Sequence, residues 1–369
     1  MTDSNIPTPN EPASPTASTA TAPVTTTSLG MQVEIGSIDR ELKKLWEQGE
    51  GALTRASLVN FAVYCHGRDA MARNTGLISK LMQSHACRAI LIGVEPEGPQ
   101  TEVEAWIDAH CHITREGAKQ VCCEQISFLL HGNAGSLIPN IVFSHLDSDL
   151  PLYLWWQGDF TESADQQLWT WVDRLFFDSL DFTDPQTQLH FLRVNIMPSA
   201  PRLVLCDLNW GRSLFLRQAI AQIFESPANI SQLKAIKRVS LSYAPGYRTT
   251  AALVVGWMIS QLNWHLENIC KDNFSFDCLG LELHEREGAP LSECTLSSED
   301  SSTYFGLKRE KDSPFWHADI RRPDGCDRHH LFPSGEDDSL TILDEELMLG
   351  GKHLVYLKAL AAAEAILAK

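Results

Sequence analysis

Residues 57–65, SLVNFAVYC, and residues 88–96, RAILIGVEP, decide the fold class of this chain. Both are short and nearly continuous apolar runs, and a helix-patterned segment, LISKLMQSHAC (77–87), lies between them. Strands that are apolar on both faces are typical of sheets that helices cover on each side. The order strand, helix, strand therefore predicts an α/β domain built around these two runs.

The segments on either side extend this pattern into a mixed sheet. Upstream, GSIDRELKKLWEQGEG (36–51) has the apolar spacing of a helix. Downstream, two strands at 102–114 and 120–132 are joined by a hairpin-like connection, and further helix–strand pairs follow up to residue 179. We expect an N-terminal α/β domain with a mixed sheet over residues 31–180.

A polar segment, DFTDPQTQ (181–188), separates this domain from a second one. Residues 205–226 predict a helix, and residues 234–262 predict a strand, a Pro-Gly turn and a helix. Shorter strand-sized pieces follow over 274–338, and an Ala-rich helix at 347–368 closes the chain. We expect a C-terminal α+β domain with antiparallel strands over residues 181–369.

Composition limits the class of function. Residues 1–30 are rich in Pro, Thr, Ser and Ala and contain no Lys or Arg, which predicts a disordered tail rather than a secretory signal. The formal net charge of −17 argues against nucleic acid or an anionic membrane surface as the main partner. Because no apolar run reaches about 18 residues, we expect no membrane span and a cytoplasmic location.

Common catalytic motifs are missing from the sequence. It has no G-x-G-x-x-G after a strand, no complete P-loop, no G-x-S-x-G and no H-E-x-x-H. We therefore assign no catalytic residue, no cofactor and no resident metal, and we expect a protein that is not an enzyme.

One metal hypothesis stays open as an alternative. In HCH (110–112), His110 and His112 share one face if the segment is a strand, and Cys122 and Cys123 lie on the neighbouring strand. Zinc needs three or four such groups to converge, which this spacing does not force. Ordinary strand packing is the favoured interpretation.

Two kinds of position are candidates for contact with a partner. Trp155 and Trp156 end an apolar strand, where alternation sends one ring to each face; we expect one ring in the core and the other near the edge. CDLNWGRS and APGYRTTA are strand-to-helix turns that can present side chains to a phosphate or a carboxylate. Their candidates are Trp210, Arg212, Tyr247 and Arg248. The favoured interpretation of the turns themselves is that Asp207, Asn209 and Thr249 cap helices while Arg pairs with a local acid.

Ten cysteines in a large chain without C-x-x-C spacing do not indicate a disulfide framework or a zinc ribbon. Most are expected to be buried apolar side chains. Four lie in the loop-rich C-terminal region, where exposure is easier, and they are the candidates for a redox pair: Cys270, Cys278, Cys294 and Cys326.

Six segments in register resemble the OpcA family. They are LVNFAVYC, HACRAILIGVEPE, VCCEQISFLLHG, LPLYLWWQGDF, CDLNWGRS and APGYRTTAALVVGW. The similarity runs from about Met31 to the C-terminal helix, and the Cys-rich form looks closest to the photosynthetic branch. Members of this family are glucose-6-phosphate dehydrogenase assembly or activator proteins.

The resemblance implies a non-catalytic protein that binds glucose-6-phosphate dehydrogenase, promotes its active oligomer and raises its response to glucose 6-phosphate. It also implies possible control by thioredoxin. Two other functions remain as alternatives: a zinc-dependent enzyme that uses the His110/His112/Cys cluster, and a sugar-phosphate binding module. The second would use Trp155 or Trp156 as a stacking face and Arg248 as a phosphate clamp.

Overall fold

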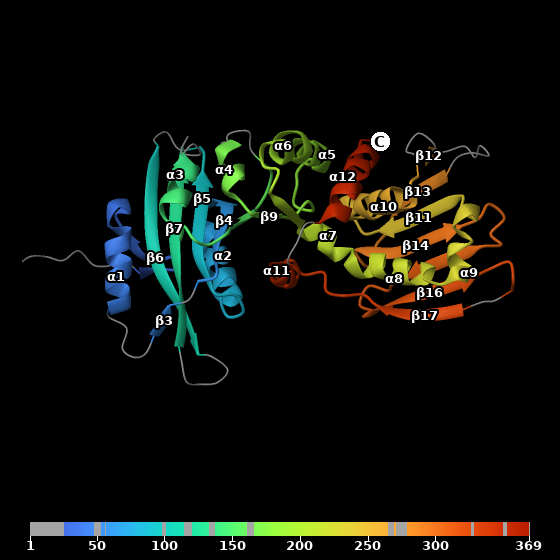
Figure 1. Cartoon of the computed structure of the whole chain (residues 1–369), viewed down its shortest axis with the longest axis horizontal. Coiled ribbons are helices and arrows are strands. Elements are labelled where there is room, and N and C mark those ends of the chain that lie inside the picture. The colour runs from blue at the N-terminus through green and yellow to red at the C-terminus, as the bar shows by residue number, and fades with distance from the viewer. Residues whose placement is uncertain are drawn as a thin grey trace, which may run out of the picture.

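The computed structural model describes residues 26–47, 53–55, 57–97, 101–113, 120–132, 137–160, 166–264, 269–270, 279–325, 328–349 and 353–368. Two β-sheets lie side by side, and helices from the middle and the end of the chain fill the space between them (Figure 1). The predicted class, an α/β part with a mixed sheet followed by a part with antiparallel strands, is confirmed.

The first sheet has the order β1-β2-β6-β7-β5-β4-β8-β9-β10, and β3 pairs with β7 off this path. The strands from β7 to β10 along this order run parallel, whereas β1, β2 and β6 add antiparallel pairs. The bounds are β1 Thr26–Thr27, β2 Gly30–Val33, β3 Leu53–Arg55, β4 Val59–His66, β5 Cys87–Glu95, β6 Glu102–Ile113, β7 Gln120–His131, β8 Leu152–Trp156, β9 Arg174–Phe177 and β10 Val204–Asp207.

Alternation along the central strands builds a core on each face of this sheet. Phe61 and Val63 of β4 pack in the same cluster as Met71 of α2 (Gly67–Leu81). Their neighbours Ala62 and Tyr64 join the opposite cluster, which includes residues of α1 (Ile38–Glu47), α3 (Ile138–Ser144) and α4 (Gln166–Trp171). Burial on both faces explains why these strands are almost continuously apolar.

The approach of α2 to the sheet requires a glycine. A Cβ at Gly93 of β5 would lie 2.2 Å from the sulfur of Met71. The absence of a side chain at this position therefore lets the helix pack directly on the strand.

The second sheet has the order β12-β13-β11-β14-β15-β16-β17. Four antiparallel pairs connect β11 to β17, and β12, β13 and β11 run parallel to one another. The bounds are β11 Arg238–Tyr243, β12 Ile269–Cys270, β13 Leu279–Glu285, β14 Leu291–Ser297, β15 Tyr304–Lys308, β16 Phe315–Arg321 and β17 Arg328–Pro333.

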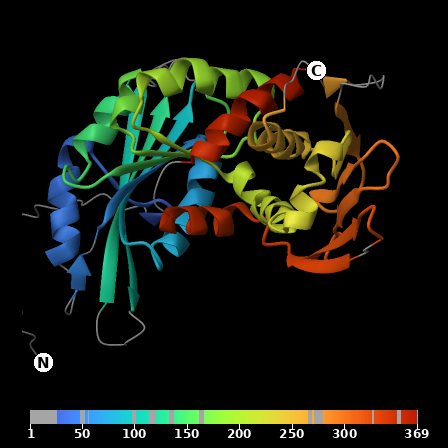
Figure 2. The same ribbon diagram turned by 45° about the vertical axis from the view of Figure 1, so that its right-hand side comes forward.

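The longest helices between the sheets are α10 (Arg248–Leu262) and α12 (Leu354–Leu367), which cross closely (Figures 1 and 2). A Cβ at Gly256 of α10 would lie 2.5 Å from the carbonyl oxygen of Ala359 in α12. The Ala-rich sequence of α12 therefore fits its place against α10. Shorter helices complete this layer: α5 Pro185–Phe191, α6 Met197–Ser199, α7 Leu208–Arg212, α8 Leu214–Phe224 and α9 Pro227–Ile230.

Three local features differ from the expectations. The first sheet begins at Thr26, inside the segment expected to be a tail, while residues 1–25 lie outside the described residues. The predicted helix at 205–226 starts instead as β10, which pairs with β9 and carries the first sheet to Asp207. Helix α11 (Ser339–Met348) was not expected; in Figure 2 it lies beside α2.

Candidate interaction site

The paired tryptophans are both buried, on opposite faces of β8. Trp155 belongs to the cluster under α2, and Trp156 belongs to the opposite cluster. The Trp156 ring stacks on Tyr64 with 3.7 Å between the ring centroids, and its Nε1 donates to the carbonyl oxygen of Asp159. Alternation was correctly predicted, but the expectation of one ring near the edge is wrong, because helices cover both faces.

This burial also removes the stacking face of the sugar-phosphate module. A sugar would need an exposed ring, whereas Tyr64 already occupies the face of Trp156. Only Arg248 of that arrangement is exposed, in the first turn of α10. The two parts of the hypothetical site are therefore not available together.

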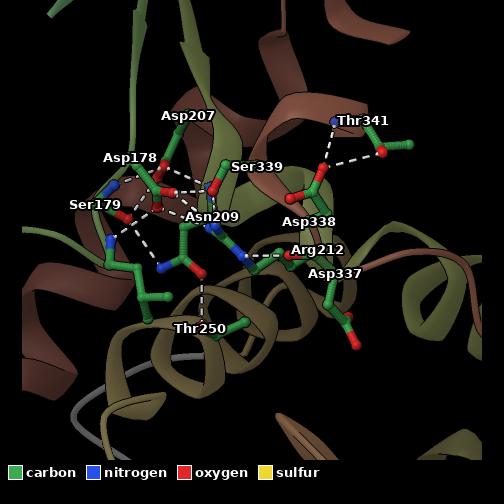
Figure 3. Close-up of polar contacts among 11 residues, drawn as sticks. Asp178, Ser179, Asp207, Asn209, Arg212, Thr250, Asp337, Asp338, Ser339 and Thr341 are labelled. Carbon is green, nitrogen blue, oxygen red and sulfur yellow. Dashed lines mark hydrogen bonds and ion pairs between the residues drawn. The ribbon is translucent and has the colours of Figure 1, made fainter. Parts of the chain in front are cut away.

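Arg212 lies in a buried polar network at the ends of β9 and β10, next to the helices between the two sheets (Figure 3). Its Nη1 and Nη2 donate to the two carboxylate oxygens of Asp178, each over 2.7 Å. The guanidinium also donates to the Asp337 carbonyl and to the Ser339 hydroxyl at the start of α11. Arg212 thus connects the end of β9 with α7 and α11, which is the pairing with a local acid that the sequence favoured.

Asp207 is the second centre of this network. Its side chain caps α7 by accepting from the Asn209 backbone, and it accepts from the backbone and hydroxyl of Ser179 and from the Tyr356 hydroxyl. Burial raises the pKa of Asp207 to about 7, and the charge of Asp178 adds to the increase. The network therefore joins β10, α7 and α12 through a carboxyl group that titrates near neutral pH.

Of the turn residues, Tyr247 and Arg248 are the two that reach solvent. Tyr247 is half-buried at the start of α10, and Arg248 is exposed. Trp210 is buried, and the guanidinium carbon of Arg217 lies 3.4 Å from the centroid of its ring. Burial lowers the pKa of Arg217 to about 9. Trp210 is thus almost fully buried, and only a small part of its ring is accessible from the cavity beside it.

A cavity of about 470 Å³ opens beside Trp210. Its walls come from α7, α8, α10, the end of α11 and the start of α12, and its lining is mostly apolar. The lining residues are Trp210, Gly211, Leu214, Arg217, Gln218, Ala221, Trp257, Glu346, Leu349, His353, Leu354, Val355 and Tyr356.

Exposed apolar side chains gather at the rim of this cavity. Leu349, Leu354 and Val355 line the cavity, and Met348, the last residue of α11, is next to Leu349 in the chain; these four are between 42% and 74% exposed. Most other exposed large apolar residues are scattered singly over the described part of the chain. We call the cavity with these four residues the α11–α12 surface. A concave apolar site with an apolar rim is typical of a protein-binding surface.

A compact group of polar side chains lies at one wall of the cavity. One ligand atom each from Cys206, Glu346 and His353 lies within 4.8 Å of the others. Glu346 Oε2 and His353 Nε2 are buried atoms 3.1 Å apart, and Glu346 Oε2 lies 3.6 Å from Nη2 of Arg174; neither makes a regular hydrogen bond among the described residues. Arg174 approaches from β9, with its Nη2 3.2 Å from the Cys206 sulfur.

The zinc cluster considered as an alternative around residues 110–112 does not form among the described residues. Cys111 of β6 is directly opposite Cys122 of β7, and the two form a disulfide. His110 instead contacts the side-chain oxygen of Gln125 over 3.0 Å. The thiol groups of Cys111 and Cys122 are used by the disulfide. Cys123 is buried directly opposite His110, but no three metal-binding side chains converge there among the described residues.

The four predicted redox cysteines are not brought together in the described part of the chain. Cys294 is on β14, where it is buried and free, and burial raises its pKa to about 12. Its expected loop exposure is wrong because this segment is a central strand. Cys270 ends β12, and Cys278 and Cys326 lie outside the described residues.

Sequence reasoning missed the α11–α12 surface. Asp338 caps α11 by accepting from the Thr341 backbone, and the run SLTILDEELM follows it. An Asp before such a run is a helix-start signal that could have revealed α11. The exposure of Leu354 had no such signal, because α12 is apolar nearly all round. Within the described residues, no helix combines the length and apolarity needed to cross a membrane.

Comparisons with known proteins agree with this architecture. Residues 78–194 match the family model for the glucose-6-phosphate dehydrogenase subunit N-terminal domain, and residues 204–360 match the model for the C-terminal domain. The boundary between the two models falls just before β10.

Curated relatives from three bacteria match about half of the chain. Proteins named OpcA, of the OxPP cycle, from Nostoc punctiforme and Synechocystis are 29% and 27% identical over 49% and 52% of this chain. The matched parts are 39% and 40% of those relatives, so the chain spans well under two thirds of their length.

A solved oxidoreductase domain protein from Kribbella flavida aligns with 84% of this chain and 96% of its own at 10% identity. Its TM-score of 0.38 is too low to support an inference. The identity rests on the two family models, which match in order and together cover most of the described chain: the chain belongs to the OpcA family of glucose-6-phosphate dehydrogenase assembly proteins.

Proposed function

We propose that the chain is a non-catalytic activator that binds glucose-6-phosphate dehydrogenase, promotes its active oligomer and raises its response to glucose 6-phosphate. The observation that carries the proposal is the ordered match of residues 78–194 and 204–360 to the two domains of a subunit named after this enzyme.

The α11–α12 surface is our candidate for the contact with the dehydrogenase. Its rim offers four exposed apolar side chains around a concave apolar floor. A central apolar anchor in a pocket, surrounded by contacts that exclude water, is how many protein interfaces obtain their affinity. Tyr247 and Arg248 remain candidates for a polar part of the interface, since they are the turn residues that reach solvent.

Activation requires that the protein bind one state of the dehydrogenase more tightly than another. A coupling of about 1–3 kcal/mol changes an affinity roughly 5- to 150-fold. Burial of a single rim side chain in only one of the two states would be enough, because a fully buried Leu, Val or Met contributes about 1.5–3 kcal/mol.

The kinetic test uses purified dehydrogenase with and without a molar excess of this protein. We expect a lower apparent KM for glucose 6-phosphate and, in light scattering, a larger complex. Unchanged KM and unchanged mass, under both oxidising and reducing conditions, would reject the proposed role.

We further propose that reduction by thioredoxin controls this activation through the disulfide between Cys111 and Cys122. Cys111 is exposed at the end of β6, so a reductant can reach it, whereas Cys122 is buried. Activation by the wild type should differ before and after treatment with reduced thioredoxin.

The control for this step compares two variants. Cys111→Ser should remove the difference between oxidised and reduced protein, and Cys278→Ser should keep it. A wild type that responds equally in both forms would contradict thioredoxin control, and a response lost only in Cys278→Ser would assign it to the C-terminal cysteines.

A further inference from the structure

We propose that Cys206, Glu346 and His353 form a binding site for a zinc ion that fastens α11 and α12 to the end of the first sheet. The proposed metal site uses polar ligands at one wall of the cavity, whereas the proposed interface uses the apolar rim. Zinc binding does not depend on the identity of the partner protein.

The donor set is the first argument. A thiolate sulfur, an imidazole nitrogen and a carboxylate oxygen are the three kinds of ligand that Zn²⁺ takes in proteins. Mg²⁺ and Ca²⁺ take oxygen ligands, so the sulfur and nitrogen disfavour them. The sequence positions are far apart, and only the fold brings the three side chains together.

The geometry is the second argument. In a tetrahedral site with bonds of about 2.0–2.3 Å, neighbouring ligand atoms lie roughly 3.3–3.8 Å apart. The three donor atoms here lie within 4.8 Å of one another, and Glu346 Oε2 is 3.1 Å from His353 Nε2. Small side-chain rotations therefore bring all three to bonding distance.

The unsatisfied atoms are the third argument. Buried polar atoms almost always have a hydrogen-bond partner, because leaving one unpaired costs about 1–3 kcal/mol. Glu346 Oε2 and His353 Nε2 make no regular hydrogen bond among the described residues; they lie 3.1 Å from each other, and Glu346 Oε2 lies 3.6 Å from Nη2 of Arg174. A shared cation would satisfy both at once.

The positive charge of Arg174 lies next to the proposed ligands and disfavours a second cation. Its contacts show how the guanidinium and a zinc ion can both be accommodated. Its guanidinium is held by the Leu349 carbonyl and lies over the rings of Tyr153 and Phe176. Its Nη2 lies 3.2 Å from the Cys206 sulfur and 3.6 Å from Glu346 Oε2, so it would be an outer donor to both anionic ligands of a bound metal. Two anionic ligands would offset the double charge of zinc, and the thiol proton would be released to solvent on binding.

The cavity supplies the fourth ligand position. Glu346 and His353 line it, so a water molecule can complete the tetrahedron from that side. The three protein ligands come from β10, α11 and the residue that precedes α12. A bound zinc would therefore fix the ends of both helices that carry the apolar rim of the α11–α12 surface.

The test adds Zn²⁺ or Co²⁺ to the untagged, metal-free full chain. We expect one tightly bound ion per chain, and with Co²⁺ a sulfur-to-metal charge-transfer band in the near ultraviolet. His353→Gln should weaken zinc binding more than about 10-fold. Loss of a direct ligand should exceed the smallest loss of affinity seen when a residue that only hydrogen-bonds to a ligand is removed. His190→Gln, at an exposed histidine paired with Glu364, should leave binding unchanged.

A second pair of variants distinguishes loss of the metal site from loss of the folded structure. Cys206→Ala should abolish the charge-transfer band while Cys294→Ala, at another buried free cysteine, keeps it; circular dichroism checks that both remain folded. No tight binding by the wild type, or binding that His353→Gln leaves unchanged, would overturn the site. Neither result affects the activation of the dehydrogenase, which is measured separately.

Discussion

Trp155 and Trp156 are neighbours in sequence, yet each belongs to a different core. Because both rings are buried, at 6% and 1% exposure, replacing either one by Ala should destabilise the fold by about 3–5 kcal/mol. Denaturant unfolding of the two variants measures this loss. Trp171→Ala, at a ring that is 57% exposed, is the control and should lose far less. A Trp155 or Trp156 variant with unchanged stability would contradict the burial.

Asp207 predicts how stability depends on pH. Its pKa is about 7 in the folded protein and 3.8 as the ordinary value, so between these two pH values the folded state holds a proton that the unfolded state has lost. The free energy of unfolding should therefore fall as pH rises from about 4 to 7, by up to roughly 1.4 kcal/mol per pH unit. The contribution is complete below pH 4 and lost above pH 7.

Asp207→Asn tests this because it removes the titrating group and keeps its size. The variant should be less stable at low pH, and its free energy of unfolding should depend less on pH over this window. Urea unfolding at several pH values gives both curves. Parallel curves for the wild type and the variant would show that Asp207 does not carry the dependence.

For single residues, the sequence predicted the hydrogen-bonding and ion-pairing roles of side chains better than it predicted which side chains are exposed. It identified Arg212 and Asp207 as a pairing and a cap, because strand-to-helix turns leave backbone groups that such side chains satisfy. It could not predict that Trp156 stacks on Tyr64, since that contact depends on the register between β8 and β4. The disulfide between Cys111 and Cys122 likewise depends on the register of the β6–β7 hairpin.

At the scale of elements, two glycines in helices should respond oppositely to the same change. Gly256→Ala places a Cβ against the backbone of α12 and should destabilise by about 1–3 kcal/mol through overpacking, more than the roughly 1 kcal/mol that Ala gains in a helix. Gly76→Ala in α2 meets nothing within 4 Å and should stabilise by about 0.5–1 kcal/mol.

Thermal unfolding of both variants provides the measurement. The reverse order, with Gly256→Ala the more stable of the two, would contradict the close crossing of α10 and α12.

Most elements could be predicted because their apolar periodicity is local. The βαβ unit, the β6–β7 hairpin, β11 and α10 follow from spacing and turn residues alone. Residues 205–226 were harder: LVLCD is only long enough for a short strand, and its pairing with β9 decides that it is one. Helix α11 was missed because its apolar residues Ile342 and Leu343 are buried against the other half of the molecule.

At the scale of the whole molecule, the two sheets are joined by polar as well as apolar contacts. Arg212 links α7 to the end of β9, and His85, in the connection between α2 and β5, lies 2.8 Å from Asp344 of α11. The helices α7 and α11, which form part of the α11–α12 surface, are therefore held in place by polar contacts with the first sheet and its connections. The sequence could name the family from six segments, but it could not locate this surface, because exposure of an apolar side chain depends on what the rest of the fold leaves uncovered.

The most direct test of the account is the affinity of this protein for glucose-6-phosphate dehydrogenase, measured by calorimetry with two leucine variants. Leu354 at the rim and Leu331 on β17 are each 60% exposed, so Leu354→Asp and Leu331→Asp are a matched pair. An acidic residue in the first turn of α12 is favourable for the helix, so Leu354→Asp should fold. The account predicts that Leu354→Asp weakens binding more than about 10-fold, as expected for an interface anchor worth over 1.4 kcal/mol, while Leu331→Asp binds like the wild type. Equal binding by all three proteins would contradict the α11–α12 surface, and no binding by the wild type would contradict the proposed function itself.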